Sequence, residues 1–99
     1  MIRNPLRRVV VTGIGLVSPL GCGNLNVWNK LIDGHSGVSS LPQHPVFESS
    51  GVSVGARVPT GVDDPQSFDE MRIFGRNVKR EYAKCTQFAL HAAQLALVD

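Results

Sequence analysis

The stretch Arg7–Gly23, RRVVVTGIGLVSPLGCG, carries the first decision about the fold of this chain. Its row of β-branched residues, Val9–Thr12, predicts a strand covered on both faces, and this row runs directly into a Gly-x-Gly turn. Nucleotide-binding loops share this outline, with the phosphate held at the N-terminus of the following helix. The stretch therefore poses a choice between a phosphate site and a structural turn.

The residues after the turn argue against a phosphate site. The dinucleotide-binding motif has a third glycine where this sequence has Ser18, and Pro19 follows it. The next helix is predicted only over residues 25–33, too far along the chain for its N-terminus to reach a phosphate at the turn. A P-loop is also ruled out by the lack of a Gly-Lys-Ser/Thr sequence. We expect a structural turn.

The first predicted helix has recognisable ends. Asn24 is a typical N-cap residue, and Gly34 stands where a C-terminal cap belongs. Its apolar residues share one face, on which we interpret Trp28 as a core anchor, with ligand stacking as the alternative.

Residues 35–69 are rich in Ser, Gly and Pro, which predicts a surface excursion with one short strand near residues 52–58. Acidic residues before residue 70 then predict the start of a helix. The final helix has the strongest pattern, because its small and apolar residues recur at steps of three and four. This stripe consists of Val78, Tyr82, Cys85, Ala89, Ala92 and Ala96. Such a helix is predicted to lie inside a larger body, with alanines that let neighbours approach closely.

Composition narrows the class of protein. Ninety-nine residues could form one modest domain, but the order strand, helix, excursion and buried helix predicts the opening of a larger α/β domain. The two cysteines are too few for a disulfide framework or a cysteine zinc site, which favours an intracellular setting. No apolar run approaches the roughly 18 residues of a membrane span.

Positive charge is concentrated in one part of the chain, which predicts a single acidic partner surface. Nucleic acid is a poorer fit, since the cluster has only Tyr82 as an aromatic neighbour and no recognisable nucleic-acid-binding module. Within thirteen residues lie Arg72, Arg76, Lys79, Arg80 and Lys84.

Several of these segments together resemble one family. Four features resemble the N-terminal part of the β-ketoacyl-acyl-carrier-protein synthases, most closely the elongating synthase II type. They are RRVVVTGIGLVSPLG, the tryptophan at position 28, LIDGHSGV at Leu31–Val38 and TQFALHAAQLAL at Thr86–Leu97. The resemblance is weakest between Ser40 and Phe74. It implies a thiolase-like α/β fold, of which residues 1–99 would be the opening part of the first α/β half. It also implies that the glycine turn is a structural corner.

The same resemblance implies a reaction for the full-length protein. These enzymes of fatty acid biosynthesis join acyl and malonyl groups, carried on acyl carrier protein, by decarboxylative Claisen condensation, as homodimers and without a cofactor. They work in the bacterial cytoplasm, the mitochondrion or the plastid. The catalytic cysteine and both histidines of the family lie beyond this part, so we expect no catalytic residue here and an inactive 99-residue chain.

The cysteines and histidines present are therefore interpreted as structural. We interpret Cys22 as a plain loop residue and Cys85 as a buried small hydrophobic residue. The three histidines, His35, His44 and His91, lack ligand spacing, so we expect no metal site.

The resemblance also implies that Arg76, Lys79 and Arg80 dock the acidic helix of acyl carrier protein. The alternative for these residues is an ordinary solvated helix face. Two other identities remain open: a ketosynthase domain of a polyketide synthase, and a truncated, non-catalytic carrier-protein-binding fragment.

Overall fold

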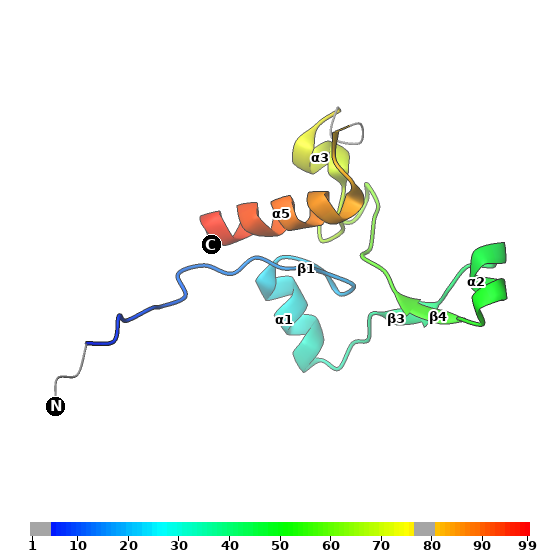
Figure 1. Cartoon of the computed structure of the whole chain (residues 1–99), viewed down its shortest axis with the longest axis horizontal. Coiled ribbons are helices and arrows are strands. Elements are labelled where there is room, and N and C mark those ends of the chain that lie inside the picture. Colours follow the sequence, from blue (N-terminus) through cyan, green and yellow to red (C-terminus); the bar gives the residue numbers. More distant parts are fainter. Residues whose placement is uncertain (1–4, 77–80) are drawn as a thin grey trace.

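The computed structural model describes residues 5–76 and 81–99 and has a mixed α/β architecture (Figure 1). Its elements are β1 Val17–Ser18, β2 Gly21–Cys22, α1 Asn24–Ile32, β3 Val38–Ser40, α2 Pro45–Ser50, β4 Val54–Ala56, α3 Glu70–Phe74 and α5 Lys84–Val98. The chain measures 64 × 33 × 28 Å and has a radius of gyration of 18.0 Å. A compact domain of this length has a radius of about 13 Å, so this chain is elongated.

The valine row does not form the predicted strand. Residues 9–12 run as an exposed segment towards β1, and Val9 is 89% exposed. The prediction was wrong for this structure because a strand needs a neighbour for its backbone N–H and C=O groups. None of the described residues pairs with this segment. The strands of this region lie further on, where β1 and β2 form a tight antiparallel pair with Val17 opposite Cys22.

The Gly-x-Gly turn is a close contact between two backbones. A β-carbon built on Gly13 would overlap the carbonyl of Ala96, and one built on Gly15 would overlap the carbonyl of Ala92. Figure 1 shows the segment that leads into β1 running beside α5. The Asp99 carboxylate accepts a hydrogen bond from the backbone N–H of Ile14 at 3.0 Å. The expected structural turn and the close approach at the alanines are therefore confirmed, because the glycines of the turn pack on Ala92 and Ala96 of α5.

Helix α1 ends as predicted but begins and packs differently. Gly34 has φ +75° and closes a Schellman motif, in which its N–H bonds to the Leu31 carbonyl and the His35 N–H to the Lys30 carbonyl. The cap at the start is Gly23, without a side-chain hydrogen bond. Trp28 is 60% exposed, so the core-anchor interpretation was wrong here.

The neighbouring Val27 is the buried residue of α1. The broader apolar face of the helix, which includes Leu25, Leu31 and Ile32, is largely exposed.

The Ser/Gly/Pro-rich region forms an outlying arm. The expected strand near residues 52–58 is present as β4, and it pairs antiparallel with β3, with Val38 opposite Ala56. The short helix α2 closes the end of this arm, far from α5 (Figure 1). Neither β3 nor α2 was predicted. Local capping explains α2, because Pro45 occupies its first turn and the His44 Nδ1 accepts from the Val46 N–H at 3.2 Å.

The core of the molecule lies between α3 and α5, around Phe68. This ring is 1% exposed and meets Phe88 edge-on with centroids 4.8 Å apart. Phe74 and His91 complete the cluster, with centroids 6.2 and 5.8 Å from that of Phe68.

The side of α5 that packs is therefore not centred on the predicted alanine stripe. Cys85 belongs to that stripe and is exposed, so the interpretation as a buried residue was wrong. The packed face lies about a quarter of a turn round the helix, because the aromatic core selects Phe88 and His91. Val78 lies outside the described residues. Within those residues, no helix combines the length and hydropathy needed to cross a bilayer.

Candidate functional site

The predicted docking residues follow directly after α3. Arg76 is exposed and comes immediately after Gly75, the glycine with φ +87° that ends this helix. Lys79 and Arg80 lie outside the described residues. Of the three predicted docking residues, Arg76 can therefore be placed, between α3 and the start of α5.

Arg72 is not a free docking cation. Its guanidinium donates to the backbone carbonyls of Ser67 at 2.8 Å, Pro65 at 3.3 Å and Asp64 at 3.5 Å. The Ser67 hydroxyl lies 2.6 Å from the Gly61 carbonyl and 2.7 Å from the Asp64 carbonyl. Arg72 therefore ties α3 to the preceding loop, and its charge is used to satisfy carbonyl groups.

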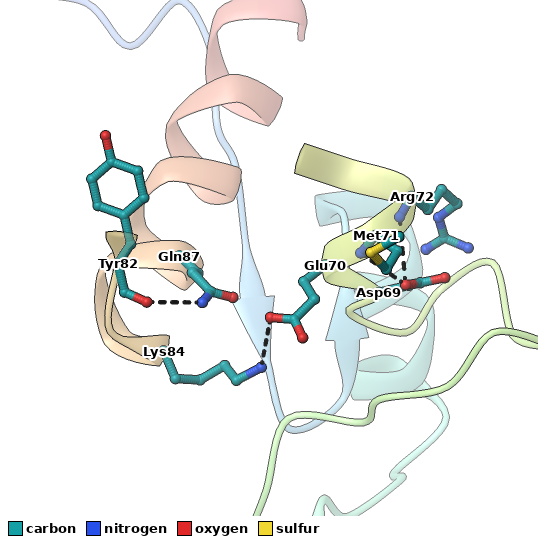
Figure 2. A network of polar contacts seen from close by, with 7 residues as sticks. All are labelled: Asp69, Glu70, Met71, Arg72, Tyr82, Lys84 and Gln87. Carbon is teal, nitrogen blue, oxygen red and sulfur yellow. Dashed lines mark hydrogen bonds and ion pairs between the residues drawn. The ribbon is translucent and has the colours of Figure 1, made fainter. Parts of the chain in front are cut away.

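Lys84 is also occupied within the chain. Its ammonium lies 3.4 Å from Glu70 Oε2 and 5.5 Å from the centroid of the Phe68 ring. The Glu70 side chain is 13% exposed and that of Lys84 is 48% exposed. Figure 2 shows the two side chains meeting across the space between α3 and α5. Among the described members of the basic cluster, Arg76 is therefore the one without an ion pair or side-chain hydrogen bond to another described residue.

The chain is anchored on both sides of this region. Asp69 caps α3 by accepting from the Met71 N–H at 3.1 Å and the Arg72 N–H at 3.4 Å, which confirms the predicted helix start. On the other side, Gln87 is 2% exposed and donates through Nε2 to the Tyr82 carbonyl at 3.0 Å (Figure 2). Sequence reasoning missed the roles of Glu70 and Gln87, because their partners lie 14 and 5 positions away.

Cys22 does not have the surroundings of an activated nucleophile. Cys22 is buried in β2, and this burial raises the pKa of its thiol, although the positive charge of Arg72 acts in the opposite direction. A raised pKa disfavours the thiolate that a nucleophile requires. Cys22 lies opposite Val17 in the β1–β2 pair, and its N–H donates to the Gln66 carbonyl at 2.8 Å, so it is not a plain loop residue.

The histidines do not form a metal centre. Among the described residues, no group of three His, Cys, Asp or Glu side chains could hold a metal ion. His91 lies against the aromatic core, and burial lowers its pKa, opposed by a side-chain hydrogen bond with Gln94. Its Nδ1 and the Oε1 of Gln87 are buried without a hydrogen-bond partner. This arrangement favours a neutral imidazole with a packing role.

Trp28 borders an apolar hollow. The hollow has a volume of about 480 Å³ and opens to solvent beside the glycine turn. Its walls are Ile14, Leu16, Asn24, Leu25, Trp28 and Asp99. The indole is 60% exposed and is thus available for contact with another apolar surface.

Comparison with known proteins gives a consistent result over nearly the whole chain. The family model described as the beta-ketoacyl synthase N-terminal domain matches residues 6–99. The chain is 39% identical to a mitochondrial 3-oxoacyl-[acyl-carrier-protein] synthase of Arabidopsis thaliana, over 94% of this chain and 22% of the relative. It is 32% identical to 3-oxoacyl-[acyl-carrier-protein] synthase 2 of Rhizobium meliloti, over 95% and 22%.

A polyketide protein is also among the similar sequences. The chain is 33% identical to the ketoacyl synthase beta subunit of the tetracenomycin polyketide synthase from Streptomyces glaucescens, over 92% of this chain and 20% of the relative. The chain therefore spans about a fifth of the length of the curated relatives it matches.

Proposed function

Because this chain belongs to the β-ketoacyl synthase family, we propose that it is the N-terminal part of a 3-oxoacyl-[acyl-carrier-protein] synthase of fatty acid biosynthesis. The observation that carries the proposal is the continuous family match, which includes the glycine turn and all of α5. The packing of Gly13 and Gly15 on α5 supports it, because it gives this segment a structural role in place of nucleotide binding.

The proposed reaction of the whole protein is a decarboxylative condensation. A cysteine thiolate first takes an acyl group from acyl carrier protein as a thioester. The malonyl group on a second carrier then loses carbon dioxide, and the resulting carbanion attacks the thioester carbonyl. A carbon–carbon bond forms, the bond to the cysteine sulfur breaks, and the thiolate is released. Cys22 does not suit the first step, because burial disfavours its thiolate, and this supports the proposal that the nucleophile lies elsewhere in the protein.

The proposed fold of the whole protein is thiolase-like, with residues 1–99 in the opening part of its first α/β half. The chain exposes 8048 Å² of surface, whereas a compact monomer of its mass exposes about 5,500 Å². The excess includes Leu25, Trp28 and Ile32 of α1, which are 68, 60 and 64% exposed. Further parts of the synthase would pack on these side chains, and the full-length protein would act as a homodimer.

The proposed partner of the basic segment is acyl carrier protein. Arg76 is exposed and, with Lys79 and Arg80, would meet the acidic helix of the carrier, whereas Arg72 and Lys84 are engaged inside the chain. Exposed ion pairs each contribute only about 0.2–1 kcal/mol and are screened by salt. They would therefore act mainly on the encounter rate and the orientation of the carrier.

Two measurements test the proposal. The full-length protein is mixed with acyl and malonyl carrier protein, and mass spectrometry follows the appearance of a β-ketoacyl product. Its absence would refute the synthase assignment. Arg80→Glu should weaken carrier binding, most strongly at low salt, while Arg8→Glu makes the same charge change in the exposed N-terminal segment and should have a smaller effect. Equal effects of the two variants would remove the docking assignment.

A polyketide ketosynthase is the second candidate, and the similarity to the Streptomyces subunit favours it. The same product assay separates the two. A fatty acid synthase enzyme releases one β-ketoacyl product per condensation, whereas a polyketide system extends the chain repeatedly without reducing it. A truncated carrier-binding fragment would be indicated by a natural product of 99 residues in an intact-mass measurement.

A further inference from the structure

The contact between Glu70 and Lys84 lies at the junction of α3 and α5, close to the proposed docking segment. It joins the first residue of α3 to the first residue of α5, across 14 positions of sequence. Glu70 is largely shielded from solvent, and Lys84 also lies over the face of the buried Phe68. Shielding and the cation–π contact both make this pair stronger than a fully exposed one.

The position of α3 determines where Arg76 lies. This helix is a single short turn with a fixed start at the Asp69 cap, and at its end the Gly75 N–H donates to the Met71 carbonyl at 3.1 Å. Arg76 follows at the next position. Only Gly75 separates α3 from Arg76, so a contact that orients α3 also orients the backbone from which Arg76 projects.

We propose that the Glu70–Lys84 ion pair is a positioning contact for carrier docking, which holds α3 against α5 and thereby places the charge of Arg76. The inference rests on the proposed function, since it assigns these two residues a part in recognition of the acidic carrier. Neither side chain touches the carrier itself. Lys84 acts on α3 through Glu70, and Gln87 holds the adjoining chain through the Tyr82 carbonyl (Figure 2).

The sign of one substitution separates this role from plain electrostatics. Glu70→Gln removes a negative charge from a basic surface, so long-range attraction alone would make an acidic carrier bind more tightly. Loss of the positioning contact has the opposite effect, because Arg76 is then presented in several orientations and the carrier must select one. A weakened affinity therefore contradicts the charge effect and supports positioning.

The experiment uses the full-length protein and an acyl carrier protein at low salt, with affinity measured by fluorescence anisotropy. We expect Glu70→Gln to weaken binding on the order of 2- to 5-fold, the effect of a modest ion pair. Glu48→Gln, on the exposed side of the distant α2, is the matched control and should leave affinity the same or slightly tighter. The charge-swapped pair Glu70→Lys/Lys84→Glu should restore part of the loss.

A double-mutant cycle then tests the link to Arg76. If the ion pair acts through this residue, Arg76→Glu should cost less affinity in the Glu70→Gln background than in the unmodified protein. Additive effects would overturn the proposal, as would a Glu70→Gln variant that binds as tightly as the Glu48→Gln control. If Arg76→Glu has no effect on affinity, Arg76 makes no docking contact. The ion pair then has no docking group to position, and the proposal is overturned.

Kinetics exclude a merely structural explanation. With carrier-bound substrate, Glu70→Gln should raise KM and leave kcat unchanged. With a small acyl thioester that lacks the carrier, both parameters should remain the same. A loss of activity towards both substrates, together with a lower melting temperature, would show a general role in folding and would overturn the proposal.

Discussion

Replacing Gly15 by alanine tests the central contact of the fold. The added β-carbon would overlap the Ala92 carbonyl oxygen and would lie 2.7 Å from the Ala96 nitrogen and 2.9 Å from the Ala92 carbonyl carbon. All of these atoms belong to the backbone of α5, so no flexible side chain can move aside. The segment and the helix would have to separate by about 1 Å, and overpacking of this kind costs about 1–3 kcal/mol.

The matched control is Gly61→Ala, which makes the same chemical change in open space. No heavy atom lies within 4 Å of a β-carbon there, and Gly61 is not among the glycines with positive φ. Alanine reduces the entropy of the unfolded chain, which stabilises a compatible site by about 0.4–1 kcal/mol. The two variants should therefore change stability in opposite directions. Thermal and urea unfolding of the full-length protein measure this, and a Gly15→Ala variant as stable as Gly61→Ala would refute the close-contact reasoning.

Three further predictions concern single groups. Because burial lowers the pKa of His91, the unfolded state binds more protons than the folded state below about pH 6.5, so stability should fall as the pH falls through this region. The fall should be smaller in His91→Gln, and identical pH profiles of the two proteins in urea unfolding would contradict this. Iodoacetamide should alkylate the exposed Cys85 of this chain in the native state and the buried Cys22 only after unfolding. Peptide mass spectrometry identifies the labelled cysteine, and labelling of Cys22 in the native state would contradict its burial. Asp69→Ala should lower the free energy of unfolding by about 0.5–2 kcal/mol, because the α3 cap is lost. Urea unfolding measures this against Asp63→Ala in the exposed loop, and an equal loss of stability in both variants would show that the cap does not stabilise α3.

The features that sequence predicted well are those fixed by neighbouring residues. The Schellman motif at Gly34 depends on a glycine that can adopt positive φ, and the cap at Asp69 depends on a carboxylate within reach of the next turn. The exclusion of a phosphate site was also local, since it followed from Ser18 and Pro19 in place of a glycine and a helix start. Short-range geometry sufficed in each case.

The features that sequence missed depend on distant partners. Which face of α5 is buried is decided by Phe68, which arrives from the loop before α3, and so the prediction for Cys85 was wrong. The basic cluster was counted as one surface, whereas Arg72 and Lys84 are engaged inside the chain. A charge pattern records where cations stand along the sequence and carries no information about which of them meet carbonyls or carboxylates after folding.

The distance along the chain between the glycine turn and its helix has a consequence for synthesis. Ile14 and Asp99, joined by a hydrogen bond, are 85 positions apart. At about 5–20 residues per second, the ribosome needs roughly 4–17 s to produce the helix on which the glycines pack. During that interval the nascent chain carries an unpaired row of valines, Val9–Val11, a composition prone to β-aggregation. Arg7 and Arg8, directly before the row, are placed as charged gatekeepers that disfavour aggregation of such a segment.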